Sequence, residues 1–290
     1  IHTLIGKEKF RKGMDKYFEL YDGKAVTTED FVNAMEVASG KDLSQFKNWY
    51  SRAGTPTLII RSRQEGDELV LDIEQKYPVT SVKVSEDNVL LLPFRISLLD
   101  KKTKEQKEHL LEVKNLKDSF RFKVQGEVIP SLNRGFSAPL HVDYPYEKSE
   151  LFELMSFDND PYCRYEATQK IYDQVLKSEL NLYNVTGKLS TDLSGEFKSA
   201  LEKLLSDEKI DYSFKSYLLD LPTESGLAQE IAQPDFDAIH LVHQHLRKKI
   251  GTTFQDWFLK EHDKLSGNSK FELTPKAFGE RALKNQCLSY

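Results

Sequence analysis

The chain has 290 residues, with 41 basic against 46 acidic side chains, and its net charge of −5 argues against nucleic acid as a general partner. This length allows two or three domains with at least one sizeable core, and a hydrophobic content of 39% fits an ordinary globular chain. No apolar run approaches the roughly 20 residues that a membrane helix needs, so no membrane partner is expected.

The first 54 residues have the apolar spacing of helices. One helix is predicted to end at Asp22-Gly23, and its apolar stripe is formed by Phe10, Met14, Tyr17, Phe18 and Tyr21. A second is predicted to begin at Thr27 or Thr28 and to end at Gly40, with Phe31, Met35 and Ala38 on one face.

A short helix with signals at both ends is predicted over residues 42–54. Asp42 can cap its first turn, and Gln45, three residues later, completes a capping box. Gly54 suits the left-handed position after the last turn, and Pro56 prevents continuation. The apolar stripe of this helix is formed by Phe46, Trp49 and Tyr50.

The pattern changes to short alternating strands over residues 55–145. Strands are predicted at 57–61, 68–75, 79–84, 89–98, 109–113, 119–124 and 140–142. Their close spacing, without helices between them, favours an antiparallel β-sandwich. The charged segment 101–107 is predicted to be a solvated hairpin tip, because it lacks the interleaved aromatic residues of a nucleic-acid site.

Residues 146–290 return to a helical pattern. Asp160-Pro161 is a cap followed by proline at the first helical position, and it predicts a long helix through Leu180. Further helices are predicted at 193–205, 212–219, 224–232, 236–265 with an interruption near Gly251-Thr252 left open, and from 274 onward. Short loops favour stacked antiparallel pairs. The predicted fold is therefore multidomain α+β: a helical segment 1–54, an antiparallel β-sandwich 55–145 and an all-α superhelical, solenoid-like domain 146–290.

The strongest candidate metal ligands are three histidines in the pattern H-x-x-H-x-H. His240 and His243 would share one helix face, and His245 follows. No glutamate follows a histidine as in HExxH, so the general base of a metalloprotease helix is missing. Asp235 and Asp237 keep adventitious metal binding open, but a polar helix face is the favoured interpretation.

The candidate nucleophiles are also weak. Gly135-Phe136-Ser137-Ala138-Pro139 imitates the nucleophile elbow G-x-S-x-G, but Pro139 forbids the required turn, so a loop is predicted. Cys163 and Cys287 lie among apolar neighbours and are predicted to be buried structural thiols. They form no CxxC motif, which excludes a disulfide framework and favours a reducing, cytoplasmic compartment. The residues therefore predict no catalytic, cofactor-binding or metal site.

Several motifs nevertheless resemble one family in order along the chain. Phe46-x-x-Trp49-Tyr50-x-x-x-Gly54-Thr55-Pro56 resembles the end of the catalytic domain in zinc aminopeptidases of the bacterial aminopeptidase N (alanyl aminopeptidase) type. Arg134-Gly135-Phe136-Ser137-Ala138-Pro139 is similar to a motif near the end of their β-sandwich. Two runs resemble their C-terminal helical domain: Asp158-Asn159-Asp160 with Arg164-Tyr165-Glu166-Ala167, and Ala282-Leu283-Lys284-Asn285-Gln286-Cys287-Leu288.

This resemblance implies three parts: 1–54 as the tail of a thermolysin-like catalytic domain, 55–145 as a β-sandwich spacer, and 146–290 as the first part of a helical domain over the active site. The family removes N-terminal residues from peptides with one zinc, using HExxH, a later glutamate ligand, a G-x-M-E-N motif and a tyrosine for the oxyanion. None of these motifs can be placed in this sequence. The resemblance therefore implies an inactive piece of an enzyme, with zinc and peptide substrates belonging to the parent protein.

Two further expectations follow from the resemblance. The missing part of the catalytic domain would pack on residues 1–54 and the spacer. Both chain ends lie inside helical patterns, so we expect a piece of a longer protein. The alternative is a non-enzymatic binding scaffold with the same β-sandwich and α-solenoid, and an HExxH motif upstream of Ile1 would decide between the two.

Overall fold

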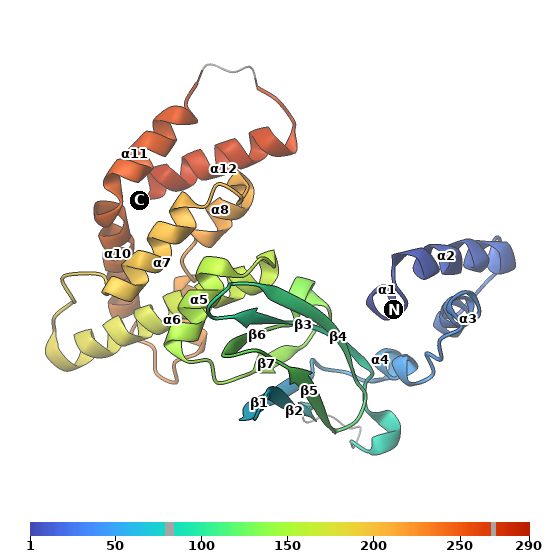
Figure 1. Ribbon diagram of the computed structural model, residues 1–290. Helices are drawn as coiled ribbons and strands as arrows, with labels where there is room; N and C mark the ends of the chain where they lie inside the picture. Colours follow the sequence, from blue (N-terminus) through green and yellow to red (C-terminus); the bar gives the residue numbers. More distant parts are fainter. Residues whose placement is uncertain (79–83, 268–270) are drawn as a thin grey trace. The chain divides into compact units, whose positions relative to one another are not determined.

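The computed structural model describes residues 1–78, 84–267 and 271–290 (Figure 1). The chain divides into two compact units, Ile1–Pro145 and Tyr146–Tyr290, and each is described by itself. The order of elements is helices, then two β-sheets, then helices, which confirms the predicted multidomain α+β class.

The first unit begins with four helices: α1 (His2–Ile5), α2 (Lys7–Tyr21), α3 (Thr28–Ser39) and α4 (Asn48–Ser51). Helix α3 has the predicted ends, because Thr27 and Asp30 form a capping box and Gly40 adopts φ 67°. The helices enclose a small core made by Leu4, Ile5, Val32, Met35, Leu43 and Leu91.

The predicted helix over 42–54 is much shorter in the structure. A 3₁₀ turn (Gln45–Lys47) precedes the single turn of α4. Asp42 accepts a hydrogen bond from Ser44 N at 2.8 Å, and the Gln45 amide donates to Lys114 O at 2.6 Å, so the predicted capping box does not form. The prediction failed because the Gln45 side chain turns away from the helix start and donates to Val89 O and Lys114 O.

This junction is attached to the segment that leads into β3. Trp49 Nε1 donates to Leu91 O at 3.0 Å, and Asn48 Nδ2 donates to Val89 O at 3.0 Å. The guanidinium of the buried Arg52 donates to Asn88 O at 3.0 Å. Three side chains thus bind consecutive stretches of one backbone and fix the helical segment on the sandwich.

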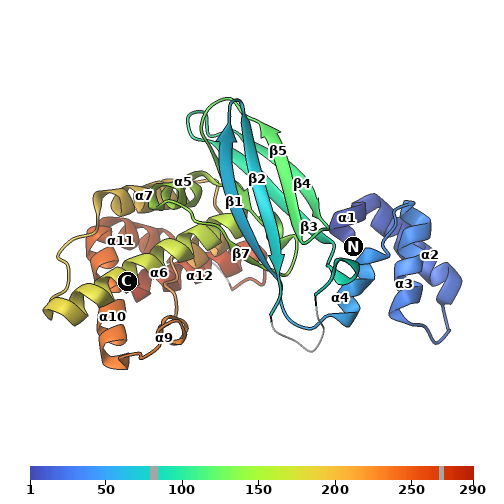
Figure 2. The ribbon, with the colours of Figure 1, turned by 90° about the horizontal axis from the view of Figure 1, so that it is seen from below.

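The sandwich consists of two sheets with strand orders β5-β2-β1-β7 and β4-β3-β6. Figure 2 shows β1 and β2 as a long hairpin. The strands are β1 (Thr57–Glu65), β2 (Glu68–Lys76), β3 (Leu92–Asp100), β4 (Gln106–Val113), β5 (Lys117–Lys123), β6 (Val128–Leu132) and β7 (His141–Asp143). The predicted strand 79–84 falls, except for Val84, outside the described residues.

Two features of the sheets differ from the prediction. Strand β7 pairs with β1 in parallel, so the sandwich is not purely antiparallel. Strand β6 was not predicted because it contains Pro130, which lacks a backbone donor. It is an edge strand that pairs with β3, where the lost donor is tolerated.

Gln75 ties the two sheets together at one end of the sandwich. Its side chain is 3% exposed, and its amide donates to Leu90 O at 3.1 Å, Val113 O at 3.3 Å and Asn115 O at 3.1 Å. Tyr77 donates its hydroxyl hydrogen to Gln75 Oε1 at 2.5 Å. One buried amide on β2 therefore binds carbonyl groups at the end of the other sheet where β3 begins and β4 ends, and one in the turn after β4.

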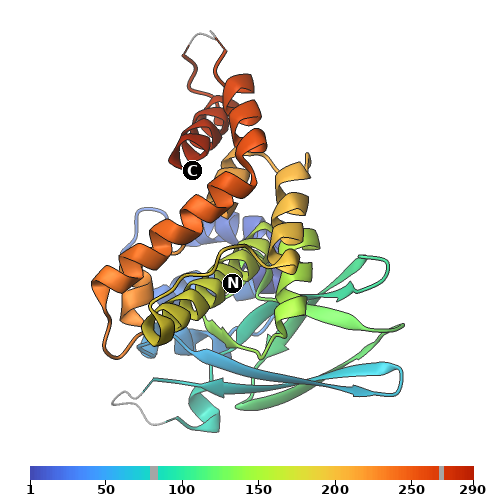
Figure 3. The same cartoon turned by 90° about the vertical axis from the view of Figure 1, so that its left-hand side faces the viewer.

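The second unit is helical: α5 (Lys148–Phe157), α6 (Pro161–Thr186), α7 (Gly195–Ser206), α8 (Tyr212–Leu218), α9 (Glu224–Gln229), α10 (Phe236–Thr253), α11 (Gln255–Lys264) and α12 (Pro275–Ser289). The predicted helix 236–265 is two helices that meet at Phe254. Helix α10 lies across α6 (Figure 3). Helix α8 packs against α12, far along the chain, where a Cβ on Gly279 would lie 2.9 Å from Ser213 N.

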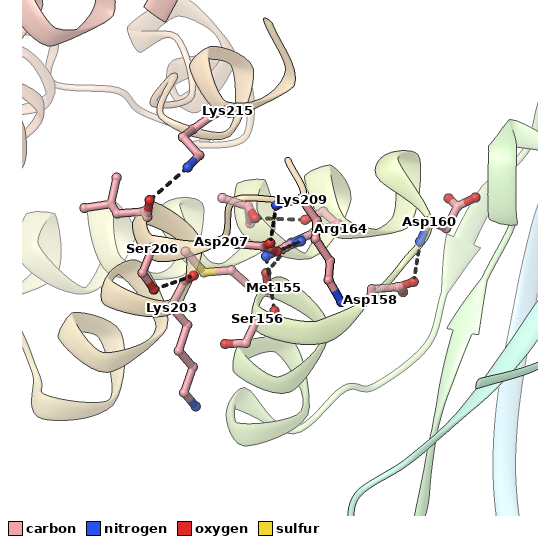
Figure 4. A network of polar contacts seen from close by, with 12 residues as sticks. Met155, Ser156, Asp158, Asp160, Arg164, Lys203, Ser206, Asp207, Lys209 and Lys215 are labelled. Atoms are coloured by element: carbon pink, nitrogen blue, oxygen red, sulfur yellow. Dashed lines mark hydrogen bonds and ion pairs between the residues drawn. The ribbon is translucent and has the colours of Figure 1, made fainter. Parts of the chain in front are cut away.

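A buried arginine closes the C-terminal end of α5 (Figure 4). Arg164, on α6, donates from Nε to Met155 O at 2.8 Å and from Nη2 to Ser156 O at 3.1 Å. Its Nη1 lies 2.8 Å from Asp207 Oδ2, at the end of α7. Arg164 thus satisfies the last carbonyl groups of one helix and links it to the next helical pair.

The last carbonyl groups of α7 and α8 also accept hydrogen bonds from side chains outside their own helix. Lys215, on α8, donates from Nζ to Leu205 O at 2.8 Å in the last turn of α7. The hydroxyl of Tyr172, on α6, donates to Leu218 O at 2.9 Å. Tyr290 donates to Leu219 O at 2.5 Å. Side chains from other helices therefore satisfy the buried ends of three helices.

Replacing Gln75 with Leu should lower the free energy of unfolding of the first unit by about 3 kcal/mol, because three buried carbonyl groups lose their donor. Urea denaturation in a Trp257→Phe background, with Trp49 as the fluorophore, measures this change. The control is Gln64→Leu at the exposed end of β1, where one hydrogen bond to Gly66 O is lost. If both substitutions lowered the free energy of unfolding by the same amount, the proposed role of Gln75 in holding the two sheets together would be wrong.

Replacing Arg164 with Met should lower the free energy of unfolding of the helical unit by about 3 kcal/mol at neutral pH, because two carbonyl groups and one carboxylate lose their donors. Burial alone would raise the pKa of Asp207, but hydrogen bonds from Arg164 and from the backbone N–H of Lys209 outweigh it and lower this pKa. The stabilisation is therefore present above the ordinary carboxyl pKa, about 3.9, and is lost as the pH falls through that range.

The stability gap between the wild type and Arg164→Met should therefore narrow in acid, as measured by urea unfolding with far-ultraviolet circular dichroism. Lys198→Met on α7, which breaks an exposed pair with Glu202, is the control and should change stability by less than about 0.5 kcal/mol. A gap that stays constant from neutral pH to about pH 3 would contradict the role given to Asp207.

Candidate functional site

The three candidate histidines on α10 bind neighbouring segments. His240 Nδ1 lies 2.9 Å from Glu224 Oε1. His243 is buried, its Nε2 donates to Pro222 O at 3.1 Å, and its Nδ1 lies 3.6 Å from the same glutamate oxygen. Burial, with Arg247 nearby, lowers the pKa of His243. Both rings therefore hold the start of α9, and the predicted polar face is wrong for His243, which is part of the core.

His245 faces a different segment, since its Nε2 donates to Ser190 O at 2.8 Å. Ser190 N also donates to Glu179 Oε2 at 3.1 Å, and Lys249 Nζ lies 3.2 Å from Glu179 Oε1. Asp235 accepts from Ala238 N at 3.0 Å as the cap of α10. In the ranges 1–78, 84–267 and 271–290, no group of three His, Cys, Asp or Glu side chains could hold a metal ion. The three histidines do not form a zinc site, because His240 and His243 face Glu224 whereas His245 faces Ser190.

The candidate serine holds its own loop in place. Ser137 follows a 3₁₀ turn (Arg134–Phe136) in which Asn133 and Gly135 have positive φ. Its Oγ accepts from Arg95 N at 2.9 Å and donates to Asn133 Oδ1 at 3.1 Å. This agrees with the predicted loop and leaves no role for Ser137 as a nucleophile.

The cysteines are both free and buried, as predicted. Burial, with Glu261 nearby, raises the pKa of the Cys287 thiol to about 11, so it stays protonated at neutral pH. The segment 101–107 forms the turn of the β3–β4 hairpin, as predicted. Asp100 Oδ1 accepts from Thr103 N at 2.7 Å, and Lys101 Nζ lies 3.1 Å from Glu127 Oε2.

The helical unit contains a groove of about 1260 Å³ between the end of α7, α8, α11 and the start of α12. Trp257, Phe278 and Ile210 supply its apolar surface. Lys215 and Glu261 line the same groove, and Glu261 is paired with Lys264 at 2.9 Å. Its described lining combines aromatic and aliphatic side chains with a few charged groups, which is the composition of a binding site.

Lys215 is the polar residue of this groove that the sequence did not indicate. It is 6% exposed, its Nζ lies 5.9 Å from the centroid of the Trp257 ring, and burial lowers its pKa. Its neighbours on α8 are aromatic or small and give no periodic signal. The lysine is buried because α7 and α11 converge on it, and no local pattern contains that information.

Three protein-family models match three consecutive regions of the chain. Residues 1–50 match the peptidase family M1 domain. Residues 54–145 match a domain of unknown function, DUF3458, with an Ig-like fold, and residues 148–290 match its C-terminal companion with ARM repeats. The Ig-like and ARM-repeat descriptions agree with the sandwich and the helical unit.

Relatives of the same kind align over the whole chain. Aminopeptidase N of Haemophilus influenzae and that of Escherichia coli are each 32% identical over 100% of this chain and 34% of their own length. Aminopeptidase N of Caulobacter vibrioides is 33% identical over 99% of this chain and 33% of its own. The crystal structure of Legionella pneumophila aminopeptidase A in complex with aspartic acid has a TM-score of 0.83 and 29% identity, and covers 99% of this chain and 33% of that one.

The chain thus spans about one third of the length of the relatives it matches. Of the helices in the described ranges, none has the length and apolarity to cross a membrane. The three matched regions follow one another along the chain, and the three curated relatives described above are all named aminopeptidase N. The chain is therefore similar over its whole length to bacterial aminopeptidase N, and its first 50 residues match the peptidase family M1 domain.

Proposed function

We propose that this chain is a non-catalytic part of a zinc aminopeptidase that removes N-terminal residues from peptides. In this proposal residues 1–54 are the end of the catalytic domain, 55–145 the spacer, and 146–290 the first part of the helical domain over the active site. The observation that carries it is the alignment with aminopeptidase N over the whole chain, together with a peptidase-domain match limited to residues 1–50.

Zinc and the catalytic base belong, in this proposal, to the parent protein outside these residues. The sequence contains no HExxH. The histidines with metal-ligand spacing bind Glu224, Pro222 O and Ser190 O instead. When bound in the parent protein, zinc would polarise the scissile carbonyl and activate water. Two free, buried cysteines support a reducing, cytoplasmic location as part of the same proposal.

The role of this chain would be to position the catalytic domain. The hydrogen bonds of Asn48, Trp49 and Arg52 to residues 88–91 fix the last turn of the catalytic domain on the spacer. Apolar side chains remain exposed on the helical segment: Phe18 is 57%, Val37 59% and Tyr50 50% exposed. We infer that the remainder of the catalytic domain packs on these side chains, because exposed apolar groups mark contact surfaces.

The purified 290-residue chain should not hydrolyse alanine p-nitroanilide in the presence of zinc, and elemental analysis should find less than one zinc per chain. Turnover or a tightly bound zinc would contradict the proposal. The coding sequence upstream of Ile1 supplies the independent test, since an HExxH motif is expected there. Its absence would favour a binding scaffold without enzyme activity.

The same chain should associate as its concentration rises, because the exposed side chains of Phe18 and Val37 would lack the catalytic domain that covers them in this proposal. Static light scattering measures this, and the double substitution Phe18→Ser with Val37→Ser should shift the molecular mass toward the monomer. The control is Val185→Ser at the end of α6, which removes a single side chain that is 76% exposed. A monomer at every concentration would contradict the proposed contact face.

A further inference from the structure

The groove between α7, α8, α11 and α12 contains an ammonium group whose hydrogen-bonding capacity is incompletely used. A lysine has three N–H donors. Lys215 donates one of them to Leu205 O, and no other acceptor lies within bonding distance among the residues that the structure describes. The side chain is 6% exposed, so bulk water does not readily satisfy the remaining donors.

The carboxylates near Lys215 are bound to other cations. Asp207 is held by Arg164 at 2.8 Å, and Glu261 is held by Lys264 at 2.9 Å (Figure 4 shows the first pair). In the described part of the chain neither forms an ion pair with Lys215. A buried cation without a paired anion is electrostatically costly, so an anion that enters the groove would gain from it.

The rest of the groove would accept an apolar group. The ring of Trp257 lies beside the Lys215 ammonium, and Phe278, which is 53% exposed, lies on α12. The exposed margin carries both signs of charge, from Lys260, Lys276, Glu208 and Asp211. The combination of a buried ammonium and aromatic walls is complementary to a small anion with a hydrophobic body.

We propose that this groove binds a small monocarboxylate with an aromatic or branched apolar body, its carboxylate on Lys215 and its body against Trp257 and Phe278. This site is independent of the proposed aminopeptidase activity, because its residues lie in the helical unit alone. It requires no covalent step. The carboxylate would take the unused N–H groups of Lys215, and the apolar body would displace water from the aromatic walls.

The test uses 3-(4-fluorophenyl)propionate and the corresponding neutral amide, which have the same number of non-hydrogen atoms. Titration of the full chain, followed by ¹⁹F NMR of the probe, should give an affinity for the acid in the roughly millimolar range. The acid should bind about tenfold more tightly than the amide, because only the acid offers a charge-assisted hydrogen bond to Lys215. Equal binding of acid and amide by the wild type, or no binding of either at about tenfold higher concentrations, would overturn the proposal.

Two substitutions separate the charge from the apolar contact. Lys215→Met should abolish the preference for the acid, and Phe278→Ala should weaken acid and amide by the same factor. Lys198→Met, an exposed lysine on α7 outside the groove, should change neither affinity. Lys215→Met could fail to fold because Leu205 O loses its donor. In that case the proposal is tested by the wild-type preference for the acid over the amide and by the effect of Phe278→Ala on both affinities. Retention of the acid preference by a folded Lys215→Met would place the anion elsewhere.

Discussion

The helical unit depends on satisfying the carbonyl groups at buried helix ends. An α-helix leaves its last four carbonyl groups without partners inside the helix, and water cannot reach them in a core. Here the donors come from other helices: Arg164 for α5, Lys215 for α7, and Tyr172 with Tyr290 for α8. Each such bond fixes the axial position of one helix against another, because sliding by one residue would remove it. The stacking of these helices is therefore specified by polar contacts as well as by apolar packing.

Sequence reasoning predicted the beginnings of these helices much better than their ends. Asp160-Pro161 and Thr274-Pro275 are local signals, and both caps form as expected. The donors at the C-terminal ends lie 8 to 71 residues away in the chain, so no local pattern could reveal them. The same limit applies to the sandwich. In the sequence Gln75 is simply a polar residue in a strand, and nothing local shows that it hydrogen-bonds the other sheet. Strand β6 was not predicted because proline is unfavourable in strands other than edge strands.

The candidate site shows the same division between local and remote information. The spacing of His240 and His243 correctly placed them on one side of a helix, where both approach Glu224. What the spacing could not show is that Pro222 O and Ser190 O would be the acceptors for His243 and His245. Lys215 was not a candidate at all, because its significance comes from burial next to Trp257, more than 40 residues away in the chain. The family resemblance supplied the overall architecture, but it did not point to this groove.

The parallel strand β7 has a consequence for the open edge of its sheet. It pairs with β1 only at Thr57–Ile59, so in the described residues the rest of that strand has no neighbour on this side. Arg61 reaches Asp143 O at 3.2 Å, and Ser62 Oγ lies 2.7 Å from the Tyr144 hydroxyl. Arg63 is ion-paired with Asp72 on the next strand. Charged side chains engaged along an exposed margin disfavour the addition of a foreign strand, and this margin is therefore a poor template for amyloid-like growth.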